Sequence, residues 1–480
     1  MSAVAPARPF QAVDAESSSW YWRRRFLNGL VMLLGDLGAL ALAMAFASWA
    51  RGSVLHLPLH PHWDAFVLLL WPLGALARGL LPSWGLGMPE EMRLTTNLLG
   101  TLFIARALAV ALVEERSWQD VAVTALEFGV AAVLVLLARS LAKWALLRVR
   151  LWGLPTVVYG GASMGRPVVE ALVENPGFGY LPVGVFDDDA AFAGTEVCGV
   201  PVLGGTHSTS RGAPLAVVAL PDLPRADLLA LHEQLLRSHR RVLLVPDLFG
   251  VQSLWAQTRD LGGVLGLELT RNLHNSVARF TKRAVDLIAV VLSGLVWVPA
   301  CLLLGLLIWL EDRAHPLFLQ ERVGENGRMF RTWKFRTMLP NAEEVLKRRL
   351  AEDPALRAEW EANFKLKKDP RITRVGAFLR KTSLDELPQL VNVLRGEMSL
   401  VGPRPLPRYH EQQLPESVRA LRLEARPGMT GLWQVSGRSD AGNAGMERWD
   451  AYYVRNWSIW LDFVILVRTV RVVLLGSGAY

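Results

Sequence analysis

The sequence predicts a multi-domain membrane protein with a four-helix transmembrane bundle, a Rossmann-like α/β domain and a mostly α-helical domain that carries a re-entrant membrane hairpin. Three observations support this fold class. Four apolar stretches occupy the first 150 residues, short apolar strands alternate with helices after Leu154, and another apolar run precedes a segment rich in lysine and arginine. The corresponding domains are predicted at 1–150, 151–270 and 271–480, with the hairpin at about 284–310.

The composition agrees with insertion into a membrane. Hydrophobic residues make up 51% of the 480 residues and the mean hydropathy is +0.25, which is high for a soluble protein. The formal net charge of +8 favours an anionic partner such as a lipid headgroup, a nucleotide or a nucleic acid. Cys198 and Cys301 are far apart and lack zinc-type spacing, so neither a disulfide framework nor a metal cluster is expected.

The apolar stretches of the first domain are each near the ~20 residues that cross a bilayer. They lie at 26–50, 65–81, 94–113 and 121–147. Basic residues flank the outer ends of this set, so the positive-inside rule places both ends in the cytoplasm. The polar N-terminus lacks a small-residue cleavage site, and no removable signal peptide is expected. Asp36, Arg78 and Arg106 lie in or near these stretches and indicate either a functional pathway or pairing and snorkelling within the bundle.

Alternating strands and helices in the second domain are typical of an open parallel sheet. The first turn contains Gly160, Gly161 and Gly165, and Asp187 follows the next strand, where a ribose-binding acid would fall. Ala162 replaces the middle glycine of the dinucleotide fingerprint, and no tyrosine has a lysine four residues later, as a dehydratase or epimerase would need. A structural or regulatory role is therefore favoured over a catalytic one.

The apolar run at 284–310 has two interpretations. It is long enough to span a bilayer, but Pro299 would break a helix there by removing an amide donor and crowding the preceding turn. A re-entrant hairpin broken at Pro299 and a proline-kinked spanning helix are the alternatives. The basic flanks and the basic segment that follows favour the hairpin, because a spanning helix would carry that segment across the membrane.

Two adjacent carboxylates, Asp385 and Glu386, lie in this basic segment. Ser383 and Glu386 have capping-box spacing and apolar residues follow at helical intervals, which predicts that the pair lies in the first turn of a helix. Capping alone explains most such pairs. The surrounding cations favour phosphate chemistry instead, because a carboxylate at a helix start stays ionised beside a bound phosphate.

Four cations near the pair are candidate phosphate ligands: Lys334, Arg336, Arg380 and Arg404. Arginine forks match phosphate oxygens, and several cations can neutralise a diphosphate while leaving its phosphorus open to attack. One carboxylate can then act as nucleophile and the other can hold Mg²⁺. The sequence contains neither HExxH nor a P-loop motif, so metalloprotease and P-loop ATPase chemistries have no support. Nucleic acid is not an expected partner, because the basic segment is attached to a membrane hairpin rather than to a soluble module with interleaved aromatic residues.

From about residue 280 to the end, the chain resembles the bacterial sugar transferases known as monotopic phosphoglycosyl transferases, which move a sugar 1-phosphate from a UDP-sugar to polyprenyl phosphate. Four motifs carry the resemblance, and the upstream domains match the long form of the family. The motifs are KFRTM at 334–338, SLDELPQ at 383–389, VGPRP at 401–405 and RPGMTGLWQVSGR at 426–438. The C-terminal residues 453–458 and 478–480 are most similar to members that transfer galactose 1-phosphate.

The resemblance implies roles for individual residues. Asp385 would attack the sugar-bearing phosphorus and expel UMP, and Glu386 would support Mg²⁺ or proton transfer. Arg380 and Arg404 match phosphate-binding arginines, and the family breaks its hairpin at a Ser-Pro pair, which is Val298-Pro299 here. Residues assigned to the nucleotide or sugar are Arg426, Gln434 and Arg438. A later block with acids that serve the metal or the fold contains Asp450, Tyr453 and Asp462.

The implied function is a transfer of galactose 1-phosphate from UDP-galactose to undecaprenyl phosphate through a covalent aspartyl intermediate, with Mg²⁺ as cofactor. This reaction would be the first membrane step of exopolysaccharide, O-antigen or lipopolysaccharide synthesis. The enzyme is expected in the bacterial inner membrane, in contact with its lipids, as a homodimer whose Rossmann-like and catalytic domains face the cytoplasm. Two alternatives stay open: UDP-glucose as donor, and a membrane-anchored nucleotide sensor or scaffold.

Overall fold

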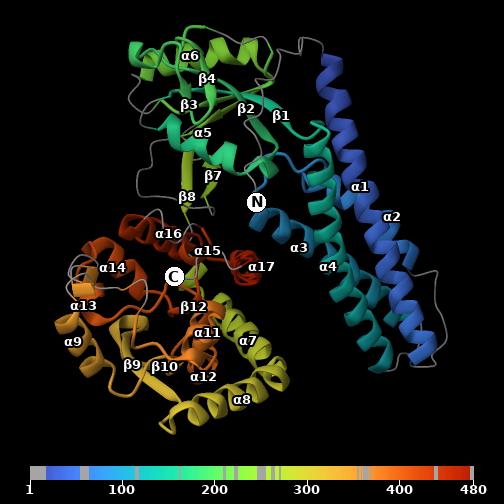
Figure 1. The fold of residues 1–480 in the computed structure, drawn as a ribbon. Coiled ribbons are helices and arrows are strands. Elements are labelled where there is room, and N and C mark those ends of the chain that lie inside the picture. The colour runs from blue at the N-terminus through green and yellow to red at the C-terminus, as the bar shows by residue number, and fades with distance from the viewer. Residues whose placement is uncertain are drawn as a thin grey trace. The chain divides into compact units, whose positions relative to one another are not determined.

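The computed structural model describes residues 18–54, 64–113, 118–161, 164–208, 212–220, 225–245, 256–260, 265–269, 272–353, 356–357, 359–360, 366, 369–436 and 442–475. The chain divides into two compact units, Met1–Phe249 and Gly250–Tyr480. Figure 1 shows helices and an α/β sheet in the first unit, and a mostly helical second unit. Helices long and apolar enough to cross a membrane occur among the described residues. These features of the predicted fold class are confirmed, while the three predicted domain boundaries stay a prediction.

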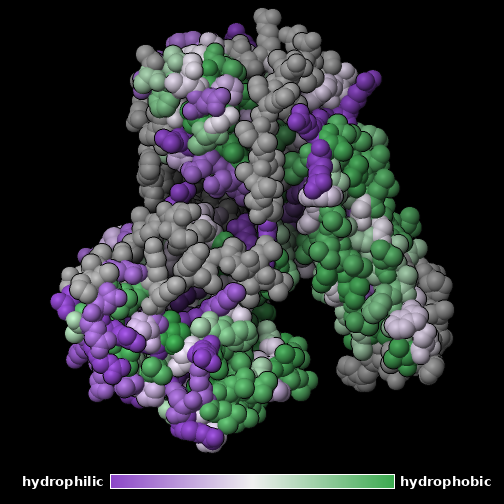
Figure 2. Space-filling model, in the orientation of Figure 1, coloured by the Kyte–Doolittle hydropathy of each residue, from purple (hydrophilic) through white to green (hydrophobic). Residues whose placement is uncertain are grey.

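Four helices open the first unit (Figure 1): α1 (Ser18–Trp49) with a π-helical turn (Ala50–Val54), α2 (Asp64–Ala77), α3 (Met88–Val113) and α4 (Trp118–Arg148). Of the residues described in this unit, Ser19–Val54 and Asp120–Arg148 form helices long and apolar enough to cross a membrane. α2 has 14 residues, fewer than the ~20 that a span needs, and α3 carries Glu90 and Glu91 in its first turn. A bundle of four spanning helices therefore stays a prediction, although Figure 2 shows hydrophobic surface over this part of the unit.

Buried charges join these helices. Arg139 of α4 pairs with Asp36 of α1 at 2.6 Å and with Glu91 of α3 at 3.1 Å. Arg106 and Glu127 form a second buried pair, between α3 and α4. An unpaired charge in a low-dielectric interior is strongly unfavourable, whereas a hydrogen-bonded pair is tolerated. For Asp36 and Arg106, pairing within the helix cluster is therefore the interpretation that the structure supports.

A six-stranded sheet follows the helices, in the order β3-β4-β2-β1-β5-β6. All its strand pairs are parallel except β3 with β4. The parallel strands, numbered along the chain, lie in the order 3-2-1-4-5 of a Rossmann sheet. The strands are β1 (Leu154–Tyr159), β2 (Tyr180–Phe186), β3 (Glu196–Val197), β4 (Val200–Gly204), β5 (Leu215–Val218) and β6 (Arg241–Leu244), with helices α5 (Gly165–Glu174) and α6 (Arg225–Ser238).

The glycine turn after β1 is closed by contacts within the domain. The amide of Gly161 donates to the carboxylate of Asp187 at the end of β2. A Cβ on Gly165 would lie 1.5 Å from the carbonyl oxygen of Gly160, so only glycine allows this close approach. Ala162 and Ser163 lie outside the described residues. Because one amide that could bind a pyrophosphate is already occupied, the turn favours a structural or regulatory role over cofactor binding.

The second unit is mostly helical, with short two-stranded sheets. The strand pairs are β7 (Ala256–Asp260) with β8 (Leu265–Leu269), β9 (Leu317–Val323) with β10 (Met329–Phe335), and β11 (Ser399–Val401) with β12 (Gly428–Thr430). The helices are α7 (Ser276–Leu292), α8 (Gly294–Asp312), α9 (Ala342–Glu352), α11 (Arg374–Thr382), α12 (Gln389–Arg395), α13 (Arg408–Glu411), α14 (Glu416–Leu423), α15 (Leu432–Val435), α16 (Gly442–Asn456) and α17 (Ile459–Leu475).

Both arms of the α7–α8 pair pack on the rest of this unit. Val290 of α7 is buried in one cluster with Val393 of α12. Leu304 of α8 is buried in another, with Phe335 of β10 and Leu379 of α11. At the corner between the two helices, in contrast, apolar side chains such as Leu292 and Leu295 are exposed. Figure 2 shows hydrophobic surface over this helix pair, and Gly294–Asp312 is long and apolar enough to cross a membrane.

The apolar run is interrupted at Ser293 and not at Pro299. α7 ends at Leu292, α8 begins at Gly294, and the helices meet at an angle (Figure 1), while Pro299 lies inside α8. Pro299 does not end α8. Gly294, next to Ser293, is a weak helix former, which favours a break at that point. The predicted position of the break is corrected accordingly.

Side chains next to the break satisfy the carbonyl of Val290 and reinforce the backbone hydrogen bond at Ala289. The hydroxyl of Ser293 donates to the carbonyl of Ala289 at 2.7 Å and to that of Val290 at 3.2 Å. Nε1 of Trp297 also donates to the carbonyl of Val290, at 3.0 Å. In lipid an unsatisfied carbonyl is strongly unfavourable. Ser293 therefore supplies the hydroxyl that the expected pair Val298-Pro299 lacks.

Candidate functional site

The acidic pair lies in a 3₁₀ turn, Leu384–Glu386, between α11 and α12. Ser383 ends α11 with a φ of +57°, and its side chain makes no hydrogen bond to the turn that follows. A residue with positive φ commonly ends a helix in this way. Ser383 is thus a C-cap, and the predicted capping box with Glu386 is wrong.

Two cations hold the carboxylate of Glu386. Nζ of Lys334, on β10, donates to Oε1 of Glu386 at 2.7 Å. Nη2 of Arg404, in the loop after β11, donates to the same oxygen at 3.1 Å. Charge-assisted hydrogen bonds to a partly buried carboxylate are among the stronger polar contacts in proteins. The sequence therefore brings Lys334 and Arg404 to the predicted pair, and both orient Glu386.

Asp385 is less engaged than its neighbour. In the described part of the chain, no side chain forms a hydrogen bond or ion pair with its carboxylate. Burial, and then the charge of Glu386, raise the pKa of Asp385, whereas Lys334 and Arg380 lower it. The carboxylate thus lies in the field of two cations without being paired to either, as an available nucleophile requires.

The remaining two candidate phosphate ligands have different surroundings. Arg380 of α11 donates from Nε to the hydroxyl of Thr337 at 2.9 Å and acts electrostatically on Asp385. Arg336 instead pairs with Asp312, the last residue of α8, at 2.5 and 2.7 Å. Arg380 is therefore beside the nucleophile candidate, whereas Arg336 anchors the end of the membrane helix to β10.

The residues assigned to the nucleotide or sugar are also differently placed. Arg426 pairs with Glu325 at 2.9 Å. Gln434, on α15, is buried, and its Oε1 has no hydrogen-bond partner among the described residues. Buried amide oxygens are normally satisfied, so Gln434 retains an acceptor for a ligand. Arg438 lies outside the described residues.

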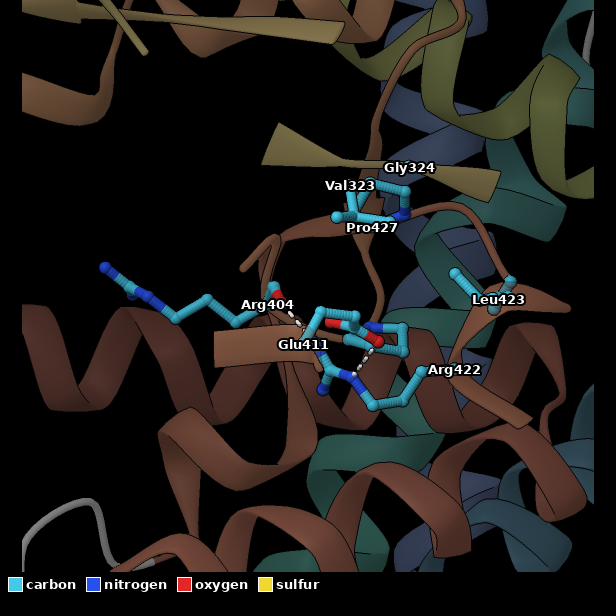
Figure 3. A pocket seen from close by; sticks show the side chains of 9 residues that line it. Val323, Gly324, Arg404, Glu411, Arg422, Leu423 and Pro427 are labelled. Atoms are coloured by element: carbon cyan, nitrogen blue, oxygen red, sulfur yellow. Dashed lines mark hydrogen bonds and ion pairs between the residues drawn. The ribbon is translucent and has the colours of Figure 1, made fainter. Parts of the chain in front are cut away.

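A buried ion network holds the backbone at Arg404 (Figure 3). Arg422 of α14 pairs with Glu411 of α13 and with Asp450 of α16, and its Nη2 donates to the carbonyl of Arg404 at 2.7 Å. A small pocket lies here, between Val323 at the end of β9 and the Arg422 side chain. Figure 3 shows the Arg404 side chain extending away from that pocket. Asp450 therefore serves the fold, by fixing the backbone from which Arg404 reaches Glu386.

A second network joins the start of α7 to the strand before Arg404. Nζ of Lys282 pairs with Asp462 of α17 at 2.6 Å and donates to the carbonyl of Val401 at 3.1 Å. The hydroxyl of Tyr453 lies 2.7 Å from Oδ1 of Asp462 and 3.0 Å from the same carbonyl. Asp462 and Tyr453 thus also serve the fold, and they connect α7 to the loop that carries Arg404.

Sequence reasoning placed Arg322, on β9, in the basic segment but did not select it as a phosphate ligand. The antiparallel register pairs Lys334 with Phe318 and Phe330 with Arg322. Because side chains alternate along a strand, Arg322 lies on the face of the hairpin that also carries Lys334. Its Nη1 donates to the carbonyl of Pro405 at 3.4 Å. The alternating pattern of the two strands was the signal that could have identified this residue.

The two carboxylates fit a magnesium ion only together with a substrate. No group of three His, Cys, Asp or Glu side chains in the described residues could hold a metal by itself. Mg²⁺ is usually held by one or two carboxylates plus substrate phosphates and water. Asp385 and Glu386 are hard oxygen donors of this kind, so a bound diphosphate would complete the set of ligands.

Comparison with known proteins identifies relatives over most of the chain. Residues 277–476 match the family described as Bacterial sugar transferase. The chain is 38% identical over 348 residues, 71% of this chain and 72% of the relative, to the UDP-galactose-lipid carrier transferase of Erwinia amylovora. It is 37% identical over 360 residues, 73% of this chain and 74% of the relative, to the undecaprenyl-phosphate galactose phosphotransferase of Salmonella typhimurium. It is also 31% identical over 343 residues, 67% of this chain and 68% of the relative, to the UDP-glucose:undecaprenyl-phosphate glucose-1-phosphate transferase of Escherichia coli.

Proposed function

The chain belongs to the bacterial sugar transferase family and is a phosphoglycosyl transferase, and from this premise we propose that it transfers galactose 1-phosphate from UDP-galactose to undecaprenyl phosphate. The observation that carries the proposal is the difference in surroundings between the two adjacent carboxylates. Glu386 is held by two cations, while Asp385 is unpaired beside it in the field of Lys334 and Arg380. This arrangement suits covalent catalysis on a phosphate.

In the first step, a carboxylate oxygen of Asp385 attacks the sugar-bearing phosphorus of the donor. The bond from that phosphorus to the bridging oxygen breaks, the oxygen keeps the electron pair, and UMP leaves. Lys334 and Arg380 neutralise the phosphate while leaving its phosphorus accessible. Mg²⁺ held by Asp385 and Glu386 would neutralise further charge on the diphosphate.

In the second step, a phosphate oxygen of undecaprenyl phosphate attacks the same phosphorus. The bond between phosphorus and Asp385 breaks, the carboxylate is regenerated, and the sugar phosphate remains on the lipid. This acceptor phosphate lies at the membrane surface, so the site must be held there. The α7–α8 pair is the segment of the second unit suited to this task, because the apolar side chains at its corner are exposed: Leu292 by 73%, Leu295 by 89% and Val296 by 73%.

A re-entrant hairpin is the arrangement of α7 and α8 that we propose in the membrane. A spanning helix separates its ends by the ~30 Å of the hydrocarbon core. In contrast, Lys282 near the start of α7 pairs with Asp462, and Asp312 at the end of α8 pairs with Arg336, all in one compact unit. Both ends then lie on the cytoplasmic face of the inner membrane, where UDP-sugars are available.

The experiment that tests this function incubates the purified protein with Mg²⁺, undecaprenyl phosphate and a panel of UDP-sugars. We expect UMP release and glycolipid formation with UDP-galactose, and loss of both when Mg²⁺ is chelated. The Asp385→Asn variant should lose both products, whereas Glu344→Gln, an exposed acid of α9, should retain them. Turnover by Asp385→Asn would contradict the covalent step. Preference for UDP-glucose would change the sugar, and nucleotide binding without transfer would favour the sensor or scaffold.

A further inference from the structure

We propose that Arg322 and Arg404 form a subsite for the nucleotide-side phosphate of the donor, the phosphate that leaves in UMP. The inference rests on the transferase function proposed above and assigns to Arg322 a role in binding a nucleoside diphosphate and in stabilising the departing nucleoside monophosphate.

One face of the β9–β10 hairpin carries four polar side chains and two phenylalanines. Lys334, Thr332 and Phe330 lie opposite Phe318, Gln320 and Arg322, and alternation places all six on one face. At one end Lys334 binds Glu386. Farther along, Oε1 of Gln320 accepts a hydrogen bond from Nη2 of Arg322 at 2.5 Å. This row of side chains therefore leads from the acidic pair to Arg322.

Hydrogen bonds join β9 to the loop that carries Arg404. Besides the bond from Arg322 to Pro405, the amide of Val323 donates to the carbonyl of Leu406 at 3.0 Å. Arg322 is thereby held beside the segment in which Arg404 lies. Burial lowers the pKa of Arg322, and the positive charge of Arg404 lowers it further, whereas Tyr409 and Glu386 raise it. Two like charges held in this way are stabilised when an anion binds to both.

The site carries a net positive charge. Four cations (Lys334, Arg322, Arg380 and Arg404) and two carboxylates (Asp385 and Glu386) give a formal charge of +2, as four minus two. This excess of positive charge favours binding of a dianionic diphosphate, and a bound Mg²⁺ would add to it. Lys334 and Arg380 act on Asp385, so they lie nearest to the phosphorus that is attacked. Arg322 and Arg404 lie farther from Asp385 along the site, so we assign them to the phosphate on the nucleotide side of the donor.

Arg322 and Arg404 would also contribute to catalysis at this subsite. When the bond between the sugar-bearing phosphorus and the bridging oxygen breaks, the oxygen keeps the electron pair and UMP gains a negative charge. No proton is needed for this step. Two guanidinium groups on that phosphate stabilise the developing charge more than they stabilise the bound donor, which raises the rate of the chemical step.

The test compares Arg322→Gln and Arg322→Lys with Arg331→Gln in the full-length enzyme. Arg331 is the matched control, because its side chain is 67% exposed and pairs with Glu321 at 3.7 Å on the opposite face of the same hairpin. We expect Arg322→Gln to lower kcat/KM for UDP-galactose by about 100-fold, a loss of the size seen on removing one transition-state donor. The inhibition constant for UMP should rise about tenfold, by loss of a charge-assisted contact. Arg322→Lys should be intermediate, and Arg331→Gln should match the wild type.

A second measurement separates this inference from the proposed function. Binding of UMP is measured without acceptor, by the rise in unfolding temperature of each variant. An active wild type with unchanged UMP binding and unchanged donor kinetics in Arg322→Gln would overturn the subsite alone. A wild type that releases no UMP from any UDP-sugar would overturn the transferase function. If Arg322→Gln fails to fold, Arg322→Lys decides, because normal UMP inhibition in that variant would contradict a role for the arginine fork.

Discussion

Asp385 and Glu386 are adjacent in the chain, yet their side chains have opposite roles because different elements surround them. Lys334 from β10 and Arg404 from the loop after β11 converge on Glu386, so this carboxylate is already neutralised and oriented. Burial and the negative charge of Glu386 raise the pKa of Asp385. Neighbouring carboxylates with different surroundings are a recurring way to divide two roles in one site. The two carboxylates therefore differ in the way that the proposed roles of nucleophile and supporting group require.

A first prediction concerns the pH dependence of this nucleophile. Burial and Glu386 raise the pKa of Asp385, and Lys334 is one of the cations that lower it. Lys334→Met should therefore raise the pKa of Asp385, and the acid limb of kcat/KM should move to higher pH because the protonated carboxyl is not a nucleophile. The measurement is UMP release against pH at saturating Mg²⁺. Lys334→Arg, which keeps the charge, should leave the limb near its wild-type position, and a shift to lower pH in Lys334→Met would contradict this assignment.

For single residues, the sequence was informative where a candidate could be identified from its neighbours in the chain. Asp385 and Glu386 could be identified because two carboxylates in a basic segment are unusual, and Arg404 because prolines brace it. The role of Ser383 was misjudged, since capping-box spacing does not reveal that the residue ends the preceding helix with a positive φ. Arg322 was not selected as a phosphate ligand, because its proximity to the site depends on the register of two strands and on their contact with the Pro405 loop.

Among the elements, the α7–α8 pair shows how a helix can be broken within an apolar segment. The sequence located the apolar segment by composition, but it placed the break at Pro299 because proline is the strongest helix breaker. The structure stops the helix six residues earlier, at Ser293, where hydroxyl and indole donors satisfy the carbonyl of Val290. The position of the break therefore depends on which residues can satisfy the backbone, a property that composition alone does not reveal.

A prediction at this scale compares the donors at the break with the proline. Ser293→Ala combined with Trp297→Phe removes both donors to the carbonyl of Val290. We expect a loss of stability of about 1–3 kcal/mol, the usual effect of leaving a buried polar group unsatisfied, together with reduced transfer. Pro299→Ala should change both less, because it lies inside α8. The measurements are thermal unfolding in lipid nanodiscs and UMP release. A larger loss in Pro299→Ala than in the double variant would show that the proline determines the break.

For the whole molecule, the apolar stretches were the most reliable part of the sequence, because hydropathy over a long window depends little on tertiary contacts. Even so, α2 is shorter than a span requires, and α3 contains charges that become acceptable only when paired, as in Arg106 with Glu127. These pairings join residues distant in sequence and could not be predicted. A homodimer, the number of spanning helices and the orientation of the chain stay predictions.

The last prediction concerns this orientation. If α7 and α8 form a re-entrant hairpin, both of their outer ends face the cytoplasm, because each is bound to the same compact unit. Single cysteines replacing Ser276 or Arg313, both exposed, are introduced in a Cys198→Ser, Cys301→Ala background. Both should react with a membrane-impermeant maleimide in inside-out vesicles and neither in spheroplasts. His60→Cys, in the first predicted external loop, should show the reverse pattern. Labelling of the Arg313→Cys variant in spheroplasts, with the Ser276→Cys variant protected there, would instead mean that the helix spans the membrane, which would remove the acceptor site from the cytoplasmic face.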